Sequence, residues 1–195
     1  MRDGTLRGKS TRIAALVWVA LISLLAAGST ASQAAPDAPI ILTVVGPAQP
    51  VPAGQTFLVT IRASQAVDLG AFEFGVAINQ VVLNTQPEWM ALTPFLGSTG
   101  RSTGELRITN PANLTEPVFG AYSYGTAGGP AGSGDLATVQ FHAVTPGTST
   151  VNLTQVQVTD TDANVLPVTV VAGNVTVAPS SSLRRLFLPM LLRGR

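Results

Sequence analysis

The lone histidine, His142, and nine scattered carboxylates are the side chains of residues 36–178 best suited to acid–base chemistry. Cysteine is absent, which excludes a thiol nucleophile, a disulfide and a cysteine-bound zinc ion. A Ser-His-Asp triad would need His142, and no Gly-x-Ser-x-Gly motif accompanies it. His142 alternates with apolar residues, so it should face solvent. No two carboxylates lie in a setting typical of a glycosidase, and we therefore predict no catalytic residues.

Acidic and amide side chains alternate at Asp160, Asp162 and Asn164, as at the start of a calcium-binding EF-hand loop. The loop position that requires glycine is Val165, and the position of the closing bidentate glutamate is Val171. Aspartate and asparagine side chains also cap tight turns. We therefore expect a hairpin turn here, with no metal site and no cofactor. Weak calcium binding assisted by backbone carbonyls is the alternative.

Three aromatic residues could stack on sugar rings instead: Trp89, Tyr122 and Tyr124. Trp89 lies within an apolar stretch that includes Met90 and Phe95, and this context favours a place in the core. Tyr122 and Tyr124 are the other two candidates for contact with a carbohydrate.

The beginning of the chain has the order of a secretory signal peptide. Residues 1–12 are basic, residues 13–27 are almost entirely apolar, and small residues follow as far as Ala34. The apolar run is too short to cross a bilayer as a helix. We therefore expect residues 1–34 to be removed and the protein to be secreted or held at the cell surface.

The end of the chain, residues 179–195, contains a serine linker followed by a basic tail rich in leucine and proline. Its apolar run is too short to span a membrane, and Pro189 would interrupt a helix. The tail resembles the arginine-flanked, Leu-Pro-rich tails of exported proteins from filamentous Chloroflexi, which implies sorting or surface retention. The alternative is a basic amphipathic tail that touches the envelope. Membrane contact is expected only through the leader or this tail.

Charge is sparse and unevenly distributed. Residues 36–178 contain three arginines and nine acidic residues, a net charge of −6, so nucleic acid is not expected as a partner. Only 11% of the chain is charged, so its surface must be built from Thr, Ser, Gln, Asn and Gly. These residues suit sheets and turns better than exposed helices.

Hydrophobic alternation predicts that residues 36–178 form one all-β domain. The pattern is strongest over residues 57–61, 72–78 and 137–143, and Gly- and Pro-containing turns separate the runs. Such short, regularly spaced strands indicate a β-sandwich. We predict nine strands at residues 40–45, 56–63, 70–78, 81–85, 105–109, 117–124, 135–144, 149–159 and 167–177.

Four irregularities are expected within this pattern. A change of parity predicts a bulge near Thr154 and Gln155, and Gly173 marks a second irregularity in the last strand. Residues 87–97 should form a helical turn. Residues 125–134, rich in glycine, should form a mobile loop that does not pack.

The order of the segments resembles that of cohesin domains. The similar segments are residues 51–57 (VPAGQTF), 72–83 (FEFGVAINQVVL), 134–141 (GDLATVQF), 160–167 (DTDANVLP) and 173–177 (GNVTV). The family usually has Tyr-Asp-Pro where this chain has residues 78–80, Ile-Asn-Gln. The resemblance implies a nine-stranded jelly-roll sandwich, a shape shared with carbohydrate-binding modules. It also implies a dockerin as partner, the calcium-loaded helical tag of polysaccharide-degrading enzymes.

In cohesins the dockerin docks on the outer face of the sheet that holds the third, fifth, sixth and eighth strands. By position, the resemblance implies four contact residues: Glu73, Tyr122, Ser123 and Gly125. The family often has an acidic residue at the place of Tyr122, so the chemistry of that contact differs. The alternation of the strands adds three residues to this face: Arg107, Gln155 and Gln157. Glu73 and Arg107 could alternatively be a cross-strand surface pair.

The sequence therefore predicts a non-catalytic, extracellular, cohesin-like module that binds a dockerin-like domain. A carbohydrate-binding module that recognises polysaccharide is the alternative, since it would use the same scaffold. A structural envelope protein that associates through its edge strands is a further alternative.

Overall fold

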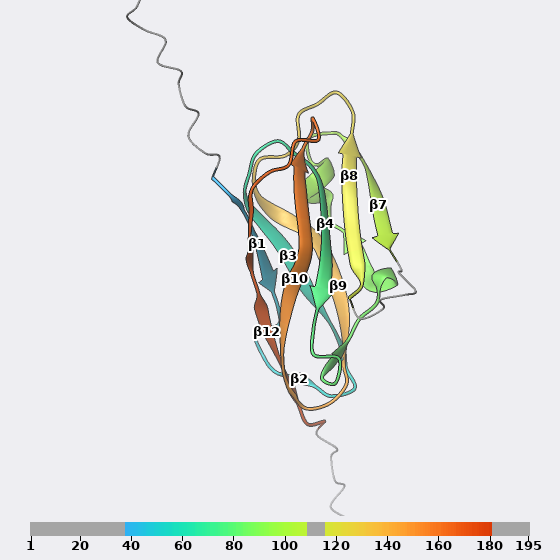
Figure 1. The fold of residues 1–195 in the computed structure, drawn as a ribbon. Coiled ribbons are helices and arrows are strands. Elements are labelled where there is room, and N and C mark those ends of the chain that lie inside the picture. The colour runs from blue at the N-terminus through green and yellow to red at the C-terminus, as the bar shows by residue number, and fades with distance from the viewer. Residues whose placement is uncertain (1–37, 109–115, 181–195) are drawn as a thin grey trace, which may run out of the picture. The chain divides into compact units, whose positions relative to one another are not determined.

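The computed structural model describes residues 38–108 and 116–180, which form a β-sandwich (Figure 1). The longer strands are β1 (Ile40–Val45), β3 (Thr56–Ala66), β4 (Leu69–Ala77), β7 (Ser102–Ile108), β8 (Val118–Tyr124), β9 (Gly132–Ala143), β10 (Gly147–Asp160) and β12 (Gly173–Ala178). The shorter ones are β2 (Val51–Pro52), β5 (Leu83–Asn84), β6 (Met90–Leu92) and β11 (Val168–Val171). Within these ranges no helix is long and apolar enough to cross a membrane.

Two sheets of six strands each face one another. One has the order β11–β1–β3–β9–β5, with β6 also paired to β9, and the other has the order β2–β12–β10–β4–β8–β7. The predicted all-β sandwich is thus confirmed, although the described residues contain twelve strands and not nine. The expected strand 81–85 is reduced to Leu83–Asn84, and the expected strand 167–177 is divided into β11 and β12.

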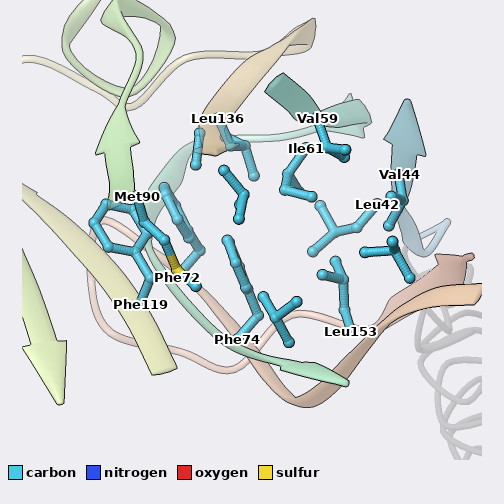
Figure 2. Close-up of a cluster of buried hydrophobic side chains, with 14 of the residues drawn as sticks. Leu42, Val44, Val59, Ile61, Phe72, Phe74, Met90, Phe119, Leu136 and Leu153 are labelled. Atoms are coloured by element: carbon cyan, nitrogen blue, oxygen red, sulfur yellow. The ribbon is translucent and has the colours of Figure 1, made fainter. Parts of the chain in front are cut away.

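The core lies between the sheets and follows the predicted alternation. Phe72 and Phe74 of β4 point inward beside Phe119 of β8, and the Phe74 and Phe119 ring centroids are 6.0 Å apart. Figure 2 shows these rings facing Ile61 and Leu136 of the opposite sheet. Large aromatic side chains bury much apolar area, so this cluster holds the two sheets together.

The irregularity at Gly173 is a change of sheet. β11 runs parallel to β1 in one sheet, whereas β12 runs antiparallel to β10 in the other. A Cβ atom at Gly173 would lie 2.8 Å from the carbonyl oxygen of Val44. Only glycine allows the chain to cross so close to β1 at this point.

The predicted bulge in β10 is confirmed. The register of β10 against β4 shifts between Thr154 and Gln157, and Gln155 has a positive φ of 50°. The extra residue restores the inward direction of Val158 after the parity change.

The segment 87–97 forms two short 3-10 turns, η1 (Pro87–Trp89) and η2 (Pro94–Gly97), on either side of β6. The expectation that Trp89 fills the core is wrong, because Trp89 is only half-buried. β6 pairs with β9 so that Met90 lies opposite Val139, and Met90 enters the core in its place.

The glycine-rich segment 125–134 is attached to the sandwich by specific hydrogen bonds. The N–H of Gly129 donates to Asp68 Oδ1 at 2.6 Å, and the N–H of Leu69 donates to the carbonyl of Pro130 at 3.1 Å. Pro130 is buried, and β9 already begins at Gly132. The expectation that this segment cannot pack is therefore wrong, because Asp68 supplies an acceptor that the local sequence does not reveal.

Candidate functional site

The outer face of the sheet β10–β4–β8–β7 carries a shallow hollow of about 190 Å³. The strands that form it lie side by side in Figure 1. We call this surface the outer hollow. It is lined by Ala71, Phe72, Glu73, Leu106, Gly120, Ala121, Tyr122, Gln157 and Thr159.

Strand register places Glu73 at the centre of the outer hollow. Because Phe72 and Phe74 point into the core, Glu73 between them must point outward. Glu73 lies opposite Gly120 of β8 on one side and opposite Gln157 of β10 on the other. Gly120 has no side chain to fill the space, and its backbone lies close to β4, since an added Cβ would approach the Phe72 carbonyl to 3.1 Å.

Tyr122 forms one wall of the outer hollow and lies across β7. Its ring occupies the place that a side chain on Gly104 would take, since a Cβ there would lie 2.6 Å from Tyr122 Cζ. Tyr124 is two residues further along the same face, with its ring centroid 6.2 Å from that of Tyr122. The two residues remain 51% and 57% exposed, so they form a paired aromatic surface.

Apolar side chains of β7 extend this surface to the edge of the sheet. Leu106 is 49% exposed and Ile108 is 39% exposed, and both share the outer face with Tyr122. A cluster of exposed apolar and aromatic residues of this kind is typical of an interaction surface.

Arg107 lies on the inner side of β7, so the expectation that it belongs to the outer face is wrong. It pairs in register with the buried Phe119, and its guanidinium lies 5.8 Å from the centre of that ring. Nη2 donates to the carbonyl of Met90 at 3.0 Å and forms an ion pair with Glu105 at 2.5 Å. Arg107 therefore pairs with Glu105 and not with Glu73.

Ser123 also lies on the side of β8 opposite Tyr122. Its hydroxyl donates to the carbonyl of Gly70 at 3.0 Å and accepts a hydrogen bond from Arg101 Nε at 2.9 Å. Arg101 Nη1 donates to the carbonyls of Gly125, at 2.9 Å, and of Ala127. Arg101, which the sequence did not single out, thus fixes both Ser123 and Gly125 in the structure.

The two glutamines of β10 have different surroundings. Gln157 is exposed and lines the outer hollow beside Glu73. Gln155 is exposed at the bulge, where its positive φ breaks the alternation. Of the seven residues predicted to contact a partner, three therefore gather in the outer hollow: Glu73, Tyr122 and Gln157.

The turn after β10 is built around the side chain of Asp160. Its Oδ1 accepts the N–H groups of Asp162 and Asn164 at 2.9 and 2.8 Å, and its Oδ2 accepts the Asn164 amide at 2.9 Å. The bond from the Asn164 side chain lowers the pKa of Asp160 below its usual value. The expected capped turn is therefore confirmed.

Asp68 binds the turn after β10 to the glycine-rich segment at the same end of the sandwich. Its Oδ2 accepts the hydroxyl of Thr161 at 2.6 Å, while Oδ1 accepts the N–H of Gly129. The bond from Thr161, followed by that from Gly129, lowers the pKa of Asp68. Asp68 and Asp160 line a second hollow of about 310 Å³, but all four of their carboxylate oxygens accept hydrogen bonds from the chain.

His142 lies half-buried on the other sheet, in register with Thr56 and Asn84. Across residues 38–108 and 116–180, no three His, Asp or Glu side chains are grouped so that they could hold a metal ion. The outer hollow, with one carboxylate, one amide and an apolar rim, is thus the surface best suited to binding.

No protein-family model matches the sequence, and neither does any curated protein. Solved cohesin modules nevertheless share its fold. A type I cohesin of Clostridium thermocellum, crystallised with a dockerin, superposes with a TM-score of 0.58 at 12% identity, covering 74% of this chain and 97% of that one. A non-cellulosomal cohesin of the archaeon Archaeoglobus fulgidus has a TM-score of 0.55 at 14% identity, and the match covers 72% of this chain and 92% of that one.

A third similar structure is the cohesin module of a family 33 glycoside hydrolase from Clostridium perfringens. It has a TM-score of 0.56 at 12% identity and covers 72% of this chain and 98% of its own. Each match spans nearly the whole cohesin module. By fold, this chain is a cohesin-type jelly-roll sandwich.

Proposed function

We propose that this protein is an exported, non-catalytic binding module that holds a dockerin-like domain on its outer hollow. The observation that carries the proposal is the position of this hollow. It lies on the face formed by β4, β7, β8 and β10, the strands that correspond to the docking face implied by the cohesin resemblance. Cohesins with the same fold have been crystallised in complex with dockerins.

The composition of the outer hollow suits a helical protein partner. Leu106, Ile108 and Tyr122 offer apolar surface that a partner could cover, and the floor at Gly120 lets it approach the backbone. Glu73 offers a carboxylate to a lysine, arginine or hydroxyl of the partner. Large aromatic residues at the centre of an interface usually dominate its binding energy, and we therefore expect Tyr122 to be the main anchor.

Export is part of the proposal and rests on the ends of the sequence. The basic, apolar and small segments of residues 1–34 support secretion, and residues 179–195 support retention at the cell surface. Residues 1–34 and 181–195 lie outside the described residues.

A pull-down tests the proposal. The purified full chain is immobilised and exposed to the secreted proteins of its host, with calcium or with a chelator. We expect a dockerin-bearing enzyme to be retained only with calcium, and Tyr122→Ala to weaken its binding about tenfold or more. Leu58→Ala is the matched control, since Leu58 is 60% exposed on the other sheet. Equal binding by both variants, or retention only on polysaccharide beads, would contradict the proposal.

The exposed pair Tyr122 and Tyr124 supports a second candidate, a carbohydrate-binding module. Two neighbouring aromatic rings on a sheet face could stack on successive sugar rings of a polysaccharide. This candidate predicts retention of the full chain on cellulose or chitin without any protein partner. Retention should be lost in Tyr124→Ala and kept in Leu58→Ala.

A further inference from the structure

Strand β7 ends its sheet and presents an edge with little protection. Among the described residues it pairs only with β8, and every residue of β7 except Gly104 is exposed. Unpaired N–H and C=O groups of an edge strand can accept another strand. Outward charges often prevent this, but the outward side chains here include the apolar Leu106 and Ile108, while Glu105 and Arg107 point to the inner side.

The sequence of β7 is complementary to itself in antiparallel orientation. If Leu106 lies opposite Leu106 of a second copy, Glu105 lies opposite Arg107 and Gly104 lies opposite Ile108, each pair occurring twice. Opposite charges that face one another across antiparallel strands stabilise the pairing. We propose that β7 pairs with β7 of a second copy of this chain in a two-fold arrangement centred on Leu106.

Neighbouring registers are less favourable. Centring the pair on Glu105 would place two carboxylates opposite each other, and centring it on Arg107 would oppose two guanidinium groups. Like charges in these positions are destabilising. The register centred on Leu106 alone pairs every charge with its opposite.

The same register covers the apolar edge of the outer face. Leu106 meets its own copy, and Ile108 meets Gly104, the residue on which the Tyr122 ring lies. These contacts would remove the most exposed apolar side chains of β7 from water. A contact in which both copies use the same surface closes as a dimer and does not propagate.

The dimer goes beyond the proposed function and does not depend on it. A two-fold axis perpendicular to the sheet leaves both outer hollows facing the same side. Glu73, Tyr122 and Gln157 of both copies would then stay open to partners on one side of the dimer, while Leu106 and Ile108 contribute to the pairing.

A single engineered cysteine tests the pairing, because the chain has none. Residues directly opposite in antiparallel strands have Cα atoms about 4.5–5.5 Å apart, within the span of a disulfide. We expect mild oxidation of the full-length Leu106→Cys variant to give a cross-linked dimer. Leu58→Cys, also exposed but on a different sheet, should not form the cross-link. If both variants cross-link at the same slow rate, the proposal is overturned.

Light scattering of the unmodified full chain gives a second readout without chemical modification. The chain should have the mass of a dimer, Leu106→Lys should have that of a monomer, and Leu58→Lys should remain dimeric. A monomeric unmodified chain at the highest soluble concentration would overturn the proposal. Because these experiments contain no partner, their failure would leave the proposed function untouched.

The register itself is tested by charge exchange. Glu105→Arg and Arg107→Glu should each prevent self-pairing, and mixing the two variants should restore a dimer, because every opposed pair is then oppositely charged. Circular dichroism checks that both variants are folded, since both residues also contact β6. Folded variants that stay monomeric when mixed would overturn the register. If either variant unfolds, the result of Leu106→Cys decides.

Discussion

At the scale of single residues, small side chains shape the outer hollow as much as large ones. Gly120 leaves the floor of the outer hollow open, and Gly104 makes room for the ring of Tyr122. Glu73 faces outward because it lies between two inward phenylalanines. The sequence, through its resemblance to cohesins, implied that Glu73 lies on this face. It did not reveal the hollow, since the effect of a glycine depends on which residues lie across the strand from it.

Asp68 shows a residue whose importance is visible only in three dimensions. Its carboxylate joins the turn before β4 to two segments that are distant in sequence, through Gly129 and Thr161. The left-handed φ of 50° at Asp68 is one that asparagine tolerates well. Asp68→Asn therefore removes the charge with little change of shape.

We expect Asp68→Asn to lower the free energy of unfolding by about 1 kcal/mol at neutral pH, since hydrogen bonds to charged groups are the stronger ones. The folded-state pKa of Asp68 is lowered, so its contribution is present above the unfolded pKa of about 4 and is lost as the pH falls through the folded pKa. The difference in free energy of unfolding between the wild type and Asp68→Asn should thus become smaller as the pH is lowered. Urea unfolding over a pH series measures it.

Asp162→Asn is the control for this prediction. The side chain of Asp162 accepts no hydrogen bond from the described residues, although it lies in the adjoining turn. Its substitution should leave stability nearly unchanged at every pH. If Asp68→Asn lowers the free energy of unfolding by the same amount at every pH, the ionised carboxylate of Asp68 does not stabilise the fold as described.

At the scale of the elements, β7 closes one side of the sandwich with side chains. Glu105 Oε1 accepts the N–H of Leu92 at 2.9 Å, and Arg107 donates to the carbonyl of Met90. The Leu92 N–H and the Met90 carbonyl both belong to β6, the short edge strand of the opposite sheet. Glu105 and Arg107 thus supply to β6 the hydrogen bonds that a further strand would otherwise provide.

This arrangement explains why alternation misplaced Arg107. On a buried strand the apolar residues point inward, but both sides of β7 are exposed, so its apolar Leu106 and Ile108 point outward. The alternation of polar and apolar residues therefore predicts that Arg107 points outward, whereas its side chain points to the inner side. Strands β3, β4 and β9 were predicted well because one face of each is covered by the core.

We expect Arg107→Ala to lower the free energy of unfolding by about 1–2 kcal/mol, because it leaves the Met90 carbonyl without its donor and exposes Phe119. A double-mutant cycle with Glu105→Ala should give a coupling energy of about 0.5–1 kcal/mol. Urea unfolding of the four proteins measures both. Arg62→Ala breaks a more exposed ion pair, with Asp135, and should change stability little. If Arg107→Ala lowers the free energy of unfolding as little as Arg62→Ala does, the contact of Arg107 with β6 does not stabilise the sandwich.

At the scale of the whole molecule, the order of strands is the part of the fold that periodicity could not supply. β1 pairs with β11 and β2 with β12, both in parallel, although these partners are more than a hundred residues apart. Alternation specifies which face of a strand is buried but not which strand lies beside it. The resemblance to cohesins supplied the sandwich type, and Gly173 supplied the position at which the last strand changes sheet.

The two sheets share one core, so the sandwich should unfold as a single cooperative unit. Phe74 is fully buried and contacts aromatic rings of β4 and β8, while Figure 2 places it opposite side chains of the other sheet. We expect Phe74→Leu to lower the free energy of unfolding by about 1–2 kcal/mol, because the smaller side chain leaves unfilled volume. The loss of stability should affect the strands of both sheets equally.

Native-state hydrogen exchange measures this distribution directly. Amides at the centres of β3 and β9 in one sheet, and of β4 and β8 in the other, should lose protection by the same factor in Phe74→Leu. Leu58→Ala, on the exposed face of β3, should leave that protection unchanged. If protection falls only in β4 and β8, the two sheets are separate folding units. The shared core would then not be what maintains the shape of the outer hollow. Uniform loss would mean that Glu73, Tyr122 and Gln157 keep their spacing for as long as the whole sandwich is folded.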